Sequence, residues 1–98
     1  MSHIELAQEV GDDFDRILEH LALYQVENPA LRIREIIEAL NVLEYNPMIG
    51  RPVNNGKREL VIGRHSRGYV ALYRYIVEVD TVIVLAVRRQ QEAGYAVL

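Results

Sequence analysis

Two amphipathic segments that follow each other almost without a loop constrain the fold of this chain most strongly. After Gly11, apolar residues recur at three- and four-residue spacing, which is typical of one helix face: Phe14, Ile17, Leu18, Leu21 and Tyr24. The second segment has a similar stripe, made of Ile33, Ile36, Ile37, Leu40 and Leu43. Between them, in "ENPAL", Asn28 is the expected N-cap and Pro29 the expected first residue of the second helix. Because neither helix can bury its stripe alone, we expect a helical hairpin that packs on another layer.

The acidic residues near the start of the first helix are assigned to its surface. Asp12, Asp13 and Asp15 follow Gly11, where a helix N-terminus favours negative charge, so we expect the helix to begin there. Together with Glu5 and Glu9, they are expected to form a solvated face.

Four strands are predicted around this hairpin. "HIEL", residues 3–6, is an expected edge strand, and three further strands follow the Pro- and Gly-containing linker of residues 46–56. They run from Lys57 to Gly63, Tyr69 to Val77 and Thr81 to Arg88. The connections between these three are too short for a parallel crossover, so they form an antiparallel meander. The predicted fold class is α+β: one domain, residues 1–98, in which a helical hairpin packs on a small antiparallel sheet in the order β-α-α-β-β-β.

The middle strand of the meander has two chemically different faces. Val70, Leu72 and Ile76 alternate with Tyr69, Ala71, Tyr73 and Tyr75. We expect the aliphatic face to receive the helices, which leaves the tyrosine face for another role.

The charge of the chain is divided between its two halves. Residues 1–50 carry three arginines and ten acidic residues, a formal charge of −7, whereas residues 51–98 carry eight basic and four acidic residues, a charge of +4. An anionic target would therefore be attracted only locally, to the second half. A protein that works by extensive nucleic-acid contact is usually basic overall, and this one has a net charge of −3.

Several kinds of chemistry lack the residues they need. There is no cysteine, and the three histidines are too widely separated for a metal site, so no metal or other cofactor is expected. No Gly-rich phosphate loop is present, and the neighbours His65 and Ser66 do not suit a nucleophile and its base. The apolar runs are too short to cross a bilayer, and the first residues lack the features of a signal peptide. We expect a cytoplasmic protein without a membrane partner.

The residues with the clearest functional chemistry are arginines and tyrosines of the second half. Arginine binds phosphate with two hydrogen bonds and tyrosine stacks on bases, so they could form an RNA-binding or catalytic surface. The alternative is that the arginines are solvated at strand ends and the tyrosines fill a half-buried face, which is the more common arrangement. The set consists of Arg58, Arg64, Arg67, Arg74, Arg88, Arg89, Tyr69, Tyr73, Tyr75 and Tyr95.

The order of these parts resembles the RelE/ParE superfamily of bacterial toxins from type II toxin–antitoxin systems. The resemblance runs from about His3 to Tyr95, through the hairpin, "NPMIGRP", "RELV", "YVALYRY" and "VIVLAVRRQQEAGY". The P-x-x-G-R-P linker, followed by R-E-L and Y-x-x-x-Y-R, is similar to the ParE-like, plasmid-stabilisation branch.

This resemblance implies a toxin that a cognate antitoxin neutralises by wrapping part of its surface. ParE-like members are described as poisons of DNA gyrase, whereas RelE-like members cleave mRNA on the ribosome. By motif position, the residues of a nuclease would be Arg58, Arg64, Arg88, Arg89 and Tyr95. The chain departs from that pattern, because Lys57 is its only lysine and its net charge is negative.

We therefore favour a toxin that inhibits gyrase by protein contact over an enzyme. Its target- or antitoxin-binding residues are expected to be Arg58, Arg64, Arg67, Tyr69, Tyr73, Arg74 and Tyr75. Operator DNA would be contacted only through the antitoxin. Two alternatives remain open at this point: a metal-independent, ribosome-dependent mRNA endoribonuclease, and a non-toxic protein that binds its antitoxin and represses the operon with it.

Overall fold

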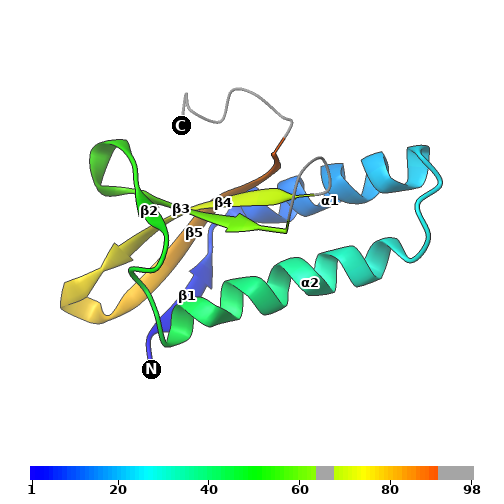
Figure 1. The fold of residues 1–98 in the computed structure, drawn as a ribbon. Coiled ribbons are helices and arrows are strands. Elements are labelled where there is room, and N and C mark those ends of the chain that lie inside the picture. The colour runs from blue at the N-terminus through cyan, green and yellow to red at the C-terminus, as the bar shows by residue number, and fades with distance from the viewer. Residues whose placement is uncertain (64–67, 91–98) are drawn as a thin grey trace.

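A computed structural model of the chain describes residues 1–63 and 68–90. Within these ranges, two α-helices lie side by side along one face of a five-stranded sheet (Figure 1). The elements follow in the order β1 (His3–Leu6), α1 (Gln8–Leu23), α2 (Pro29–Asn41), β2 (Arg51–Pro52), β3 (Arg58–Ile62), β4 (Tyr69–Ile76) and β5 (Thr81–Arg89).

The α+β class and the helical hairpin on a sheet are confirmed, and the sheet is mixed. Its strand order is β1-β5-β4-β3-β2, and the meander β3-β4-β5 is antiparallel as predicted. β1 pairs with β5 in parallel, with His3 opposite Thr81. This follows from the topology, because the whole hairpin and three strands separate β1 from β5 and leave room for a crossover. β2, a two-residue strand against β3, was not predicted.

The start of α1 differs from the prediction, whereas α2 begins at Pro29 as predicted. α1 begins at Gln8 and passes through Gly11, so Asp12, Asp13 and Asp15 lie inside the helix rather than at its start. Asn28 occupies the N-cap position of α2 in the left-handed conformation, without a capping hydrogen bond from its side chain. Pro29 does occupy the first turn of α2, where no amide donor is needed.

The core lies between the hairpin and the tyrosine face of β4, so the predicted assignment of the two faces is wrong. Tyr69, Ala71 and Tyr73 are buried in the same apolar cluster as Ile17 of α1 and Ile36 of α2. Val70, Leu72 and Ile76 alternate with these residues along β4 and lie on the other face of the sheet. A phenol can be buried when its hydroxyl group is bonded, and this condition is met for Tyr73.

Tyr73 holds the linker of residues 46–56 against the sheet. Its ring is fully buried, and its Oη accepts a hydrogen bond of 2.8 Å from the backbone N–H of Gly50. Arg58 donates to the carbonyl oxygens of Gly50 (2.7 Å) and Met48 (3.1 Å), and Arg51 forms an ion pair with Glu59. Burial raises the pKa of the Tyr73 phenol, an effect that the Gly50 N–H and the nearby Arg58 partly offset. The P-x-x-G-R-P motif is thus part of a structural contact.

A second polar contact joins the N-terminus to the turn between β4 and β5. The hydroxyl groups of Ser2 and Tyr75 each donate to Oδ1 of Asp80 at 2.6 Å. These hydrogen bonds hold the pKa of the Asp80 carboxyl below its usual range. The contact anchors the start of β1 next to the turn that begins β5.

We expect Gly50→Ala to destabilise the protein. A Cβ at Gly50 would lie 2.6 Å from the carbonyl oxygen of Glu59 and 2.7 Å from the hydroxyl of Tyr73, so the linker would have to move. The loss in free energy of unfolding should be about 2 kcal/mol or more, measured by urea denaturation. Gly11→Ala is the matched control: a Cβ there meets open space within α1, and it should stabilise by about 0.5–1 kcal/mol. A Gly50→Ala variant as stable as wild type would contradict this packing.

We also expect Asp80→Asn to change how stability depends on pH. The pKa of Asp80 is lower in the folded state, so its contribution is fully present above the ordinary Asp pKa of about 3.9 and is lost as the pH falls through the folded value. Asp80→Asn should lower stability at neutral pH and flatten the loss of stability below about pH 4. Denaturation series from neutral to acidic pH measure this, with Glu78→Gln in the same turn as the control. Parallel curves for wild type and Asp80→Asn would argue against the anchor.

Candidate functional site

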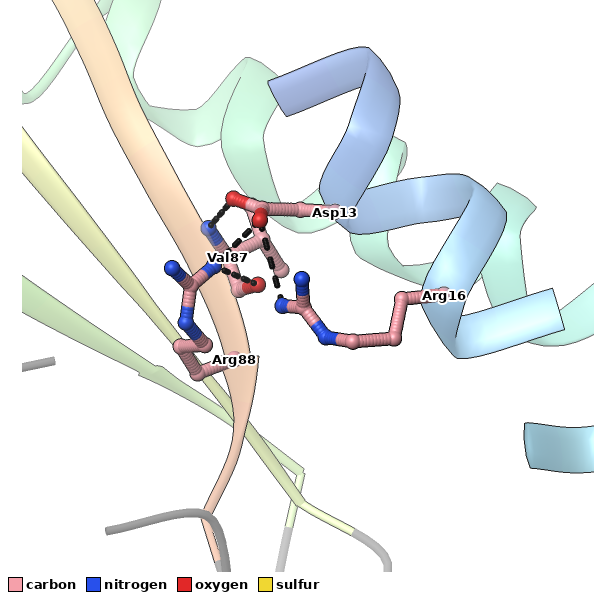
Figure 2. A network of polar contacts seen from close by, with 4 residues as sticks. All are labelled: Asp13, Arg16, Val87 and Arg88. Carbon is pink, nitrogen blue, oxygen red and sulfur yellow. Dashed lines mark hydrogen bonds and ion pairs between the residues drawn. The ribbon is translucent and has the colours of Figure 1, made fainter. Parts of the chain in front are cut away.

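A buried carboxylate fixes α1 against β5 beyond the end of β1. The side chain of Asp13 is 4% exposed and points from α1 towards β5, as Figure 2 shows. Its Oδ2 accepts a hydrogen bond of 2.9 Å from the backbone N–H of Val87, and its Oδ1 pairs with Arg88 and, at 3.1 Å, with Arg16. The expectation that Asp13 belongs to a solvated face is therefore wrong. The reason is that β1 ends at Leu6, so the N–H of Val87 requires another acceptor.

A β-bulge in β5 determines which of its two last arginines, Arg88 or Arg89, lies on the helix side of the sheet. The register shifts because Leu72 pairs with Ala86 and the next residue, Tyr73, pairs with Val84, which leaves Leu85 as an extra residue. Val87 is consequently buried in the same core as Val82 and Val84. Arg89 lies on the helix side of the sheet, while Arg88 reaches Asp13 around the edge of β5.

On the helix side, Arg89 contributes to a pocket of about 400 Å³ between the tip of the hairpin and the sheet, which we call the helix–sheet pocket. Its walls come from α1, the α1–α2 connection, the first turns of α2, the start of β4 and the end of β5. The lining residues are His20, Leu21, Val26, Glu27, Arg32, Tyr69 and Arg89.

The polar side chains of the helix–sheet pocket lie close enough to interact. Nη1 of Arg89 lies 3.1 Å from Nε2 of His20, where a neutral imidazole accepts from the guanidinium. The ring of His20 also contacts that of Tyr24, with centroids 4.7 Å apart. Burial raises the pKa of the Tyr69 phenol, and the positive charges of Arg32 and Arg89 offset part of that rise. The pocket therefore brings together two guanidinium groups and a phenol hydroxyl, a set of donors suited to binding an oxyanion.

The residues predicted to bind a target are distributed over the protein. Tyr69 and Arg89 are brought together in the helix–sheet pocket. Arg74 donates to the carbonyl oxygen of Asn55 at 2.8 Å, on the face of the sheet away from the helices. Arg58, Tyr73 and Tyr75 make the internal contacts described above, so any role in binding stays a prediction. Arg64, Arg67 and Tyr95 lie outside the described residues.

Two residues of the helix–sheet pocket were not selected from the sequence: His20 and Arg32. Each lies beside the apolar stripe of its helix, and Arg32 precedes the buried Ile36 by one turn. A cationic residue one helical turn from a buried residue is a weak signal of a binding site, because arginine side chains commonly cover apolar surface without binding a ligand.

The described ranges contain no group of three or more side chains arranged to hold a metal ion. In the same ranges, no helix is both long and apolar enough to span a membrane.

Solved structures of toxin–antitoxin systems have the same fold. A chain of the chromosomal ParDE system from P. aeruginosa superposes with a TM-score of 0.74 at 24% identity, covering 91% of this chain and 96% of that one. A chain of the intact E. coli RelBE complex gives 0.63 at 14% identity, with 94% and 100% covered. A chain of RelBE2 from Mycobacterium tuberculosis gives 0.56 at 20% identity, with 91% and 98% covered. No curated protein sequence matches the chain.

These similarities define the class: the chain has the fold of the RelE/ParE toxins, as the sequence indicated. The match to a family model assigns the chain more narrowly within this class. The family model for the ParE toxin of the type II toxin–antitoxin system parDE matches residues 4–94, so the chain belongs to the ParE toxin family.

We expect Asp13→Asn to destabilise the protein by about 2–3 kcal/mol, because it leaves the partly buried Arg88 without its ion-pair partner and weakens the bond to Val87. Urea denaturation measures the loss. Asp12→Asn, the exposed neighbour in α1, is the control and should change stability by less than about 0.5 kcal/mol. If both variants unfold at the same urea concentration, the Asp13 contact does not hold α1 on the sheet.

Proposed function

We propose that this chain is the toxin of a type II toxin–antitoxin system, that it inhibits DNA gyrase by protein–protein contact, and that a cognate antitoxin neutralises it. The observation that carries the proposal is the match to the ParE toxin family over residues 4–94. The antitoxin partner is supported by the solved relatives, several of which come from toxin–antitoxin complexes. On this account the protein acts in the cytoplasm.

The internal use of several arginines supports a protein target over RNA cleavage. Arg88 pairs with Asp13, and Arg58 donates to two backbone carbonyls of the linker. A nuclease without a metal needs cationic side chains that can stabilise the negative charge developing on the phosphate in the transition state. Cations held in partly buried contacts of this kind are less available for that task.

Among the predicted contact residues, Arg74 has the most suitable position for contact with a macromolecular target. It projects from the middle of β4 on the face that the helices leave uncovered, and its bond to Asn55 is exposed. A guanidinium in this position can exchange an exposed carbonyl for a partner's acceptor at little cost.

Induction of the chain without its antitoxin should arrest growth and trigger a DNA-damage response, and the purified protein should inhibit supercoiling by gyrase. Co-expression of the antitoxin encoded beside it should restore growth. Arg74→Gln should weaken gyrase inhibition about tenfold. The matched control is Arg34→Gln, on the exposed surface of α2, which should leave inhibition unchanged.

Each contrary result identifies an alternative. Unchanged supercoiling together with cleavage of mRNA in translating ribosomes would establish the RelE-like ribonuclease, which the similarity to RelBE chains favours as the second candidate. Normal growth on induction, with an antitoxin still bound, would identify a non-toxic co-repressor.

A further inference from the structure

We propose that the helix–sheet pocket binds the carboxylate of an aspartate or glutamate that the antitoxin presents from an apolar segment. The inference rests on the proposed function for the identity of the partner. It adds the chemical group recognised and the residues that recognise it, Arg32 and Arg89.

The two arginines come from different elements of the fold, one from a helix and one from a strand. Arg32 belongs to the first turns of α2 and Arg89 to the last position of β5, and both line the same pocket. Two guanidinium groups that approach from different sides can each donate to one oxygen of a carboxylate. Tyr69 lines the same pocket, and its hydroxyl can supply a further donor.

The surroundings of the pocket favour a peptide. Leu21 and Val26 form apolar walls, and the same end of the hairpin exposes three large hydrophobic side chains, which are Leu23 (75% exposed), Tyr24 (66%) and Leu31 (46%). An exposed apolar rim around a charged centre is typical of a protein-binding surface. The ring contact between His20 and Tyr24 connects this rim to the pocket.

Nucleic acid is disfavoured at the same place. Glu27 lines the pocket, and Glu35 acts on Tyr69 from α2. A single carboxylate can enter between the two arginines, whereas a chain of phosphates would also pass these acidic side chains. The volume of about 400 Å³ is sufficient for one acidic side chain and part of an apolar neighbour.

To test the ligand, three probes are titrated into the full chain, and binding is measured by NMR from the shifts of the protein's backbone amides. The probes are the capped peptide acetyl-Leu-Glu-Leu-amide, its Gln analogue and inorganic phosphate. We expect the Glu peptide to shift the amides around His20, Arg32, Tyr69 and Arg89, and the Gln peptide to bind at least about tenfold more weakly. Equal binding of the two peptides, or tighter binding of phosphate at these residues, would overturn the carboxylate assignment.

Substitutions on the two elements locate the site. Arg32→Gln and Arg89→Gln should each weaken the Glu peptide by about tenfold and leave the weak binding of the Gln peptide unchanged. Arg34→Gln, two residues along α2 and exposed, is the matched control and should bind the Glu peptide as wild type does. Thermal unfolding of each variant separates a lost contact from a lost fold.

The antitoxin itself distinguishes this inference from the proposed function. If the antitoxin binds wild type but binds the double variant R32Q/R89Q at least tenfold more weakly, both stand. If it binds both with equal affinity, the proposed function stands and the inference is wrong. If it does not bind wild type, the proposed function fails and the assignment of the partner fails with it.

Discussion

The carboxylate of Asp13 is the contact on which the arrangement of helices and sheet depends. β1 covers the edge of β5 only as far as Val84, and beyond that point α1 takes the place of a strand by accepting the N–H of Val87 through Asp13. The same carboxylate neutralises Arg88. One side chain thereby satisfies the open edge of a central strand and fixes α1 to it.

The arrangement of elements could be predicted because it depends on local patterns. The two apolar stripes predicted the hairpin, and the short connections predicted the meander. The faces of β4 could not be assigned in the same way. Aliphatic residues and tyrosines alternate equally well there, and the choice depends on the partner of the Tyr73 hydroxyl, Gly50, which lies 23 residues earlier.

The candidate site was harder to predict because two of its determinants are tertiary. Simple alternation from Val82 and Val84 would put Arg88 on the helix side, and only the bulge at Leu85 puts Arg89 there instead. His20 and Arg32 are site residues only because they line a pocket with Tyr69. That pocket exists only when the sheet packs on the hairpin. Asp13 belongs to a run of acidic residues that indicates a solvated face, and nothing local distinguishes it from Asp12.

These features agree with the membership of the chain in the ParE toxin family. Several residues of the motifs that carry the resemblance build the fold, since Gly50, Arg58 and Tyr73 hold the linker in place. A crystal structure of the chain with its antitoxin would test the account most directly. We predict an antitoxin aspartate or glutamate within hydrogen-bond distance of both Arg32 and Arg89, with apolar neighbours against Leu23 and Tyr24. A complex in which the antitoxin leaves the helix–sheet pocket open would contradict it.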